Sequence, residues 1–224
     1  MNTVTKNLSF TGYCLVKNQT AKNFTASGES IVADLVCENL FHSSGRSQIR
    51  SSKLNKASTS GSTNLVFSTA NEIRSSGHLQ ASDCPRLGKI TASGQTAITR
   101  CAEIEKIVAS GAFSLDSSKV RGNVILSGNS AEITDSTIAG KLECASKIIK
   151  ISNSSIGRII VKPIHSTSRF ELFNWNIYQS SSPAEQLIEL SGKNCQVGSI
   201  SFTDGAVGKV LLRNGATAPK NLSE

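Results

Sequence analysis

Residues 86–111 read RLGKITASGQTAITRCAEIEKIVASG, and this stretch contains the same short pattern twice. The segment KITASG at 89–94 returns as KIVASG at 106–111, which is 17 residues later. In each copy inward positions, first large and then small, alternate with outward ones, and a two-residue period is typical of a β-strand. A short strand that recurs at a fixed interval indicates a repeat architecture.

The same register extends over most of the chain. A Gly preceded by Ser or Thr recurs at intervals of 16 or 17 residues, at Gly12, Gly28, Gly45, Gly61, Gly77, Gly94, Gly111 and Gly128. Four residues before these glycines stand Leu8, Phe24, Phe41, Ala57, Ile73, Ile90, Ile107 and Val124. Further apolar columns lie four residues after the Gly and seven before the next one. We therefore predict three short strands per coil, and we expect Ile73, Ile90 and Ile107 to share one inward column.

A second recurrent feature marks the turns between strands. Six residues before the Gly stand Asn39, Asn55, Asn71, Gly88 and Gly122. Gly and Asn tolerate the positive φ that a tight corner often requires. We therefore predict two recurrent corners per coil, one at the Gly column and one at this Asn/Gly column.

These columns predict an all-β chain that folds as a single-domain, right-handed parallel β-helix, a solenoid of about 17 residues per coil with about ten or more coils. The right hand is expected because parallel crossover connections nearly always take it. At about 4.8 Å per coil, ten coils make a rod roughly 50 Å long. An α-helical alternative lacks the i, i+3, i+4, i+7 apolar stripe.

The repeat also sets the expected domain organisation. One β-solenoid domain is predicted over residues 1–217, and residues 218–224 are expected to form a flexible tail. Within the domain, residues 164–186 break the register and contain Phe170, Phe173, Trp175 and Tyr178, so they are interpreted as a non-repeat excursion or cap. A short helix could begin at Ser182-Pro183 inside this segment, because Ser caps helices and Pro suits their first position.

Cysteine usage and the start of the chain bear on the compartment. The six cysteines show no CxxC and no zinc-site spacing, so we expect buried free thiols and no metal or cofactor. Cys84 and Cys101 share one offset, seven residues after the Gly, and are predicted to be reduced neighbours on adjacent coils. No signal peptide or membrane span is recognisable, which favours the cytoplasm, although a removed signal peptide would leave the same picture.

Three stretches, VRGNV at 120–124, IAGKL at 138–142 and IGRI at 156–159, resemble the V-x-G-x-I coils of bactofilin-like, polymer-forming bacterial β-helices. In that family, solenoids associate end to end into non-enzymatic cytoskeletal filaments, so the resemblance implies self-association. The pectin-lyase-like β-helices are the enzymatic precedent for this architecture, and their sites need clustered carboxylates or a calcium-assisted basic residue on one face.

The residues provide little support for catalysis, and no catalytic residue is assigned. Asp83, Asp116 and Asp135 recur on the second half of their coils, but glycosidase chemistry needs two carboxylates about 5 to 10 Å apart in a cleft, so we interpret them as solvated corner residues. The three histidines, His42, His78 and His165, lie in different registers, which argues against a metal site or a Ser-His-Asp triad.

Two polar columns remain as candidates for binding. Thr11, Ser27, Ser44, Ser60, Ser76, Ser93, Ser110 and Ser127 form a regular hydroxyl column. It is reminiscent of the hydroxyl ranks on ice-binding solenoids, but we expect these hydroxyls to bond the backbone at a corner.

The second column is a candidate basic stripe formed by Lys56, Lys89, Lys106, Lys141 and Arg158. The formal net charge of +8 favours acidic partners. The stripe could hold an anionic polymer through charge alone, but without interleaved aromatic residues it lacks the stacking surface of single-strand binders. The alternative is a solvated face that discourages unwanted strand pairing.

The sequence thus favours a non-enzymatic structural or binding solenoid, either a self-associating scaffold or a binder of anionic polymer. A carbohydrate-active β-helix enzyme, a polysaccharide lyase or hydrolase, is the alternative, and an ice-binding surface is a more remote one.

Overall fold

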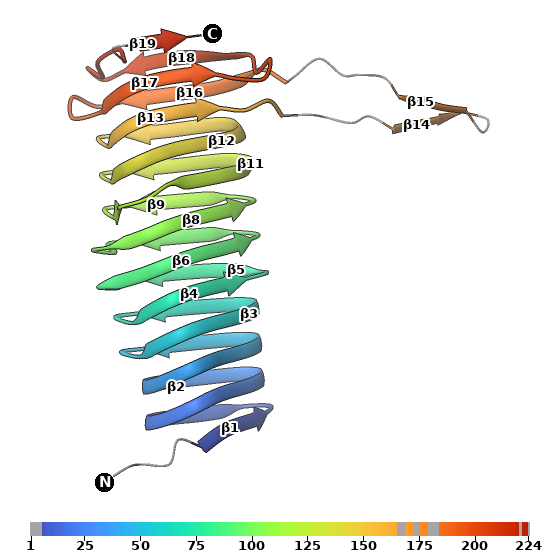
Figure 1. Cartoon of the computed structure of the whole chain (residues 1–224), viewed down its shortest axis with the longest axis vertical. Helices are drawn as coiled ribbons and strands as arrows, with labels where there is room; N and C mark the ends of the chain where they lie inside the picture. The colour runs from blue at the N-terminus through green and yellow to red at the C-terminus, as the bar shows by residue number, and fades with distance from the viewer. Residues whose placement is uncertain (1–5, 165–168, 173–174, 179–183, 220, 224) are drawn as a thin grey trace.

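The computed structural model describes residues 6–164, 169–172, 175–178, 184–219 and 221–223. The described chain is an all-β parallel solenoid of about nine turns with roughly 17 residues per coil, and it contains no helix. Figure 1 shows two layers of strands that stack along one axis, with the two termini at opposite ends. The predicted fold class is confirmed, and the roughly nine turns are slightly fewer than the ten or more predicted.

The strands follow one another along the stack in chain order. They are β1 (Lys6–Thr11), β2 (Cys14–Arg50), β3 (Lys53–Val66), β4 (Thr69–Ser75), β5 (His78–Ser82), β6 (Arg86–Ser93), β7 (Thr96–Thr99), β8 (Ile104–Ser110), β9 (Phe113–Asp116), β10 (Lys119–Val120), β11 (Val124–Thr134), β12 (Thr137–Ser152), β13 (Ser155–Val161), β14 (Arg169–Leu172), β15 (Trp175–Tyr178), β16 (Gln186–Ser191), β17 (Gln196–Phe202), β18 (Gly208–Arg213) and β19 (Asn221–Ser223). Seventeen of them form one sheet, in which coils pair with the coils before and after them.

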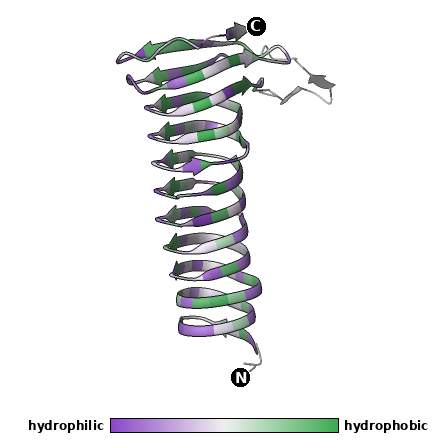
Figure 2. Cartoon of the chain, turned by 60° about the vertical axis from the view of Figure 1, so that its left-hand side comes forward, coloured by the Kyte–Doolittle hydropathy of each residue, from purple (hydrophilic) through white to green (hydrophobic). Residues whose placement is uncertain are grey.

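The register between coils follows the predicted inward column. Ile73 in β4 pairs with Ile90 in β6, which pairs with Ile107 in β8, and all three side chains are at most 1% exposed. Along each strand, apolar positions alternate with polar ones, as Figure 2 shows by colour. The apolar halves of the two layers face each other, so the core is a set of stacked columns between them.

Each coil contains three pairing segments as predicted, but the first two belong to one strand. β6 pairs with β4 through Arg86 and Leu87 and again from Lys89 onward, with Gly88 skipped between them. The predicted second corner is therefore wrong, because no residue of the Asn39 to Gly122 column has a positive φ. Gly is needed at position 88 for another reason: an added Cβ there would collide with the carbonyl oxygen of Asn71 in the preceding coil.

The true second corner lies at the other end of the coil. It is marked by non-glycine residues with φ between 48° and 54°, namely Asn18, Asp34, Ser51, Phe67, Asp83, Arg100, Ser117, Asp135 and Asn153. The predicted Gly corner is present, with positive φ at Gly12, Gly28, Gly45, Gly61, Gly94 and Gly111. In each coil we call the residues between the positive-φ corner and the next corner Gly the long face, and the residues from that Gly onward the short face. The residues of the positive-φ corner, including the turn at 192–194, are counted with the short face.

A buried column of Ser and Cys follows the positive-φ corner. Its members are Ser52, Ser68, Cys84, Cys101, Ser118, Ser136, Ser154 and Cys195. Each Ser oxygen accepts a hydrogen bond from a backbone N–H of the preceding coil, as Ser118 does from Cys101 at 2.9 Å, and donates to the carbonyl two residues before it. Where Cys replaces Ser, the thiol donates to the carbonyl two residues before it, as Cys84 does to Ser82 at 3.4 Å and Cys101 does to Thr99 at 3.6 Å. The column therefore satisfies a line of buried backbone donors that the corner leaves unpaired.

The core changes composition along the axis. Near the N-terminal end the rings of Phe24 and Phe41 stack with centroids 4.8 Å apart, and Phe10 lies 5.6 Å from Phe24. Small and hydroxyl-bearing side chains occupy neighbouring inward positions, and the hydroxyls of Thr63 and Thr96 have no hydrogen-bond partner in the described chain. Small side chains therefore fill part of the core in place of large apolar ones.

The predicted excursion forms a separate two-stranded antiparallel sheet, β14 and β15, in which Phe170 pairs with Ile177. Ser182 and Pro183, where a helix was expected to start, lie outside the described residues, as does Phe173. The repeat resumes with β16, whose Leu190 pairs with Ile151. Part of the expected tail belongs to the sheet, because β19 pairs with β17.

Candidate functional site: a basic band on the long face

The five residues of the predicted stripe stand in one column of the long face. Strand pairing joins Lys89 directly to Lys106, and Lys141 directly to Arg158. Glu72 interrupts the stripe because it pairs with both Lys56 and Lys89. All of these side chains point outward, since they alternate with fully buried neighbours along their strands.

The charges of the whole molecule divide unequally between the two faces. Within the described solenoid the long face carries thirteen Lys and Arg side chains and five Asp and Glu, whereas the short face carries nine of each. The long face is therefore +8 and the short face is neutral. A net charge gathered on one side produces a local field that an evenly spread charge would not.

The excess is concentrated in seven consecutive coils. Over residues 52–163 the long face holds eleven basic and four acidic side chains, a net charge of +7, and we call this surface the basic band. Every second coil contributes two cations and no carboxylate. These pairs are Lys53 and Lys56, Arg86 and Lys89, Lys119 and Arg121, and Arg158 and Lys162. At about 4.8 Å per coil, the pairs repeat roughly every 10 Å along the axis.

The carboxylates of the band lie between its cations. Glu103 contacts Arg121 at 3.1 Å and Arg86 at 4.0 Å, and Glu72 contacts Arg74 at 2.8 Å. These contacts fix the orientation of the neighbouring basic side chains. The band stays positive because its cations outnumber its carboxylates.

Glu143 is the most enclosed of these carboxylates. It is held by the ammonium groups of Lys141 and Lys162, the latter at 3.1 Å. Hydrogen bonds from these two lysines lower the pKa of Glu143 below its ordinary value. The carboxylate therefore stays ionised at neutral pH, and the two lysines are positioned by a fixed partner.

The hydroxyl column runs beside the band on the same face. Thr11 pairs with Ser27, Ser44 with Ser60, and Ser110 with Ser127. The eight side chains are exposed or half-buried, and none of their hydroxyls forms a hydrogen bond with the described chain. The expected backbone-bonding role is therefore wrong: the hydroxyls that bond the backbone belong to the buried Ser/Cys column instead.

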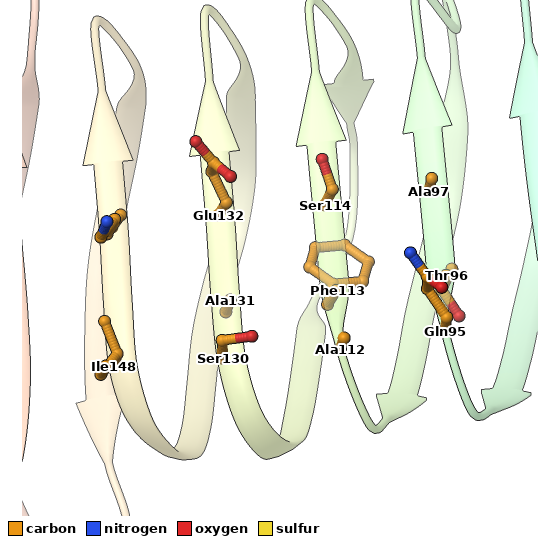
Figure 3. Close-up of a pocket in the computed structure, with 11 residues that line it drawn as sticks. Gln95, Thr96, Ala97, Ala112, Phe113, Ser114, Ser130, Ala131, Glu132 and Ile148 are labelled. Carbon is orange, nitrogen blue, oxygen red and sulfur yellow. The ribbon is translucent and has the colours of Figure 1, made fainter.

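The short face carries a shallow groove of about 380 Å³ over β7, β9 and β11. Figure 3 shows that small side chains such as Ala97, Ala112 and Ser114 leave this surface open beside Phe113. Glu132 is the one carboxylate among the residues that line it. A pair of carboxylates flanking a sugar, as in glycosidases, is not present in this groove.

The acidic residues singled out in the sequence lie at the corner. Asp83 and Asp135 both occupy positive-φ positions, which Asp tolerates better than most residues, and Asp116 immediately precedes such a position. Asp83 accepts two hydrogen bonds from Arg100, at 2.7 and 2.8 Å, and the guanidinium lowers the pKa of Asp83. These contacts support the interpretation of Asp83 as a corner residue.

The remaining candidate groups are dispersed. His42 lies on the long face and His78 on the short face, and His165 lies outside the described residues. All six cysteines are buried and free. No cluster of three His, Cys, Asp or Glu side chains suited to a metal ion occurs in the described ranges, and no helix in them could cross a membrane.

Sequence reasoning found the stripe but missed the rest of the band. The additional cations, Lys53, Arg74, Arg86, Lys119, Arg121 and Lys162, occupy several outward columns, so no single offset collects them. The sequence signal that could reveal the whole band is the net charge summed between successive corners. This sum requires both corners, and the predicted second corner is at the wrong residues. Comparison of the chain with protein-family models, with curated proteins and with solved structures gives no match.

Proposed function

We propose that this protein is a non-enzymatic binding solenoid that holds an anionic polymer along its basic band. The observation that carries the proposal is the separation of charge: the long face is +8, whereas the short face is neutral. A row of cations aligned with the axis presents regularly spaced contacts to a linear polyanion, and such contacts gain affinity from counterion release.

A charge-reversal pair tests the proposal against a matched control. Lys89→Glu with Lys106→Glu alters two neighbouring residues of the band, whereas Lys147→Glu with Lys150→Glu makes the same change in net charge on the short face. Binding of labelled heparin and of labelled DNA is measured by fluorescence anisotropy in low salt. We expect the band variant to weaken binding at least ten-fold and the control to remain near the wild type, because the control residues lie away from the ligand.

Equal weakening by the two variants would show that only the net charge matters, and the proposal would fail. Circular dichroism and thermal unfolding of both variants provide the control for folding. Lys89, Lys147 and Lys150 are exposed and Lys106 is partly exposed, and all four side chains point outward, so the solenoid should tolerate the changes.

Self-association is a second candidate, and it rests on a different surface. Leu212 in β18 pairs with the fully buried Leu190 and continues its inward column, yet its side chain is 45% exposed. Val207 and Leu211 nearby are also exposed. A second copy that stacked on this end would cover the column. Light scattering over a range of concentrations tests this, with Leu212→Lys expected to reduce any assembly.

A further inference from the structure

The length and charge of the basic band can be compared with those of candidate polymers. Seven coils at about 4.8 Å spacing extend roughly 29 Å. Double-stranded DNA of that length carries roughly 17 phosphates, of which about half face any one side. The band offers a net charge of +7 over the same distance. The phosphates on one side of the duplex are therefore similar in number to the net charge of the band.

The hydrogen-bonding groups of the long face are consistent with phosphate. The cations of the band are flanked by hydroxyls, from Ser60 to Ser127, that have no partner in the described chain. Phosphate oxygens are acceptors, and the groups that contact them in complexes are Lys, Arg, Ser, Thr and backbone N–H. Both kinds of side chain are therefore available in the same strip of surface.

The aromatic residues lie elsewhere. Among the side chains that the structure describes, the exposed aromatic ones are Tyr13 on the short face and Phe67 at the positive-φ corner, where Arg50 lies over its ring. Proteins that hold single strands stack the bases on aromatic side chains. A duplex keeps its bases stacked internally and can be bound through its phosphates alone.

We infer that the polymer held by the basic band is double-stranded nucleic acid, bound through its phosphates without sequence preference. This inference rests on the proposed function and adds the class of ligand. The duplex lies along the solenoid axis, and the cation pairs contact its backbone while the hydroxyl column donates further hydrogen bonds.

The test uses the full chain and a labelled 20-base-pair DNA duplex in two unrelated sequences. Unlabelled single-stranded DNA, heparin and polygalacturonate serve as competitors at equal total charge. We expect similar affinity for the two duplexes and weaker competition by the other polymers. The logarithm of the association constant should fall linearly with the logarithm of salt concentration, with a slope of up to about −6.

A double substitution that removes two positive charges measures how many lysines contact phosphates. Lys89→Gln with Lys106→Gln should reduce the magnitude of that slope by about 2, and Lys147→Gln with Lys150→Gln should leave it unchanged. Preferential binding of single strands or of an acidic polysaccharide overturns the inference and leaves the proposed function standing. Failure of every polyanion to bind overturns both.

Discussion

Cys84 and Cys101 occupy consecutive positions of one buried column, and each thiol donates to the carbonyl two residues before it, Cys84 to Ser82 at 3.4 Å and Cys101 to Thr99 at 3.6 Å. A thiol–thiol hydrogen bond with Cys84, together with burial, raises the pKa of Cys101. On either side of this pair the same position is Ser, at Ser68 and Ser118. Thiol and hydroxyl thus occupy the same position of the column, and both donate to the carbonyl two residues before them.

Ser118→Ala removes one connection from that column. The hydroxyl accepts from Cys101 and donates to the carbonyl of Asp116 at 2.7 Å, so its loss leaves a buried N–H without a partner. We expect the free energy of unfolding to fall by about 1 to 3 kcal/mol, measured by urea denaturation. Ser127→Ala is the matched control on the exposed hydroxyl column and should change stability by less than about 0.5 kcal/mol. Equal effects would argue against a special role for the buried column.

Thr96→Val should increase the free energy of unfolding, whereas Ser118→Ala should reduce it. The Thr96 hydroxyl is buried without a hydrogen-bond partner, and its strand neighbours in the inward column are Leu79 and Phe113. Replacing the hydroxyl by a methyl group of similar size removes the cost of desolvating it, so we expect a gain of about 1 kcal/mol in the free energy of unfolding. A loss of stability would indicate that the hydroxyl has a partner, such as a buried water molecule.

Ile90→Asp tests the inward column itself. Ile90 is 1% exposed between Ile73 and Ile107, so an aspartate there would be an unpaired charge in a stacked apolar core. The expected loss is more than about 4 kcal/mol, or failure to fold. The adjacent Thr91→Asp, on an exposed position of the same strand, should fold normally. Circular dichroism of the two variants distinguishes them, and a folded Ile90→Asp would contradict the register.

Cys144 makes the stability of the fold depend on pH in the alkaline range. Burial raises its pKa from 9.0 to about 12 in the folded protein. Below pH 9 the thiol is protonated in both states, and its contribution to stability is complete. Between pH 9 and 12 the unfolded chain loses this proton while the folded protein keeps it, so stability falls by up to about 1.4 kcal/mol per pH unit.

Denaturation curves of the wild type and of Cys144→Ala between pH 8 and 11 measure that contribution. The variant should show a shallower decline, because it lacks the group while retaining the other five thiols. Parallel declines in the two proteins would show that Cys144 ionises equally in the folded and unfolded states.

The repeat was readable from the sequence where a single residue type is required. Corner positions such as Gly45 and Gly61 are close to the backbone of the preceding coil and have positive φ, so Gly recurs there and reveals the period. The second corner was harder to read, because its Asn, Asp and Ser residues are common throughout the chain and Phe67 and Arg100 interrupt the column. At Phe67 and Arg100 the repeat geometry imposes positive φ against the local preference.

The stripe within the basic band was predictable because its residues recur at one offset, whereas the rest of the band was not. Lys89 and Lys106 were found because they share an offset, and strand pairing places them side by side. The charge separation depends on which residues lie between two corners, and it emerges only when both corners are known. Arg121, for example, stands in a different outward column and joins the band through its contact with Glu103.

Lysine footprinting on the unmodified protein tests the central claim most directly. The protein is acetylated at limiting reagent with and without a saturating polyanion, and the modified sites are quantified by mass spectrometry. We predict protection at Lys56, Lys89, Lys106, Lys119 and Lys162 on the long face, and no protection at Lys17, Lys147 and Lys150 on the short face. Uniform protection, or protection confined to the short face, would contradict the account.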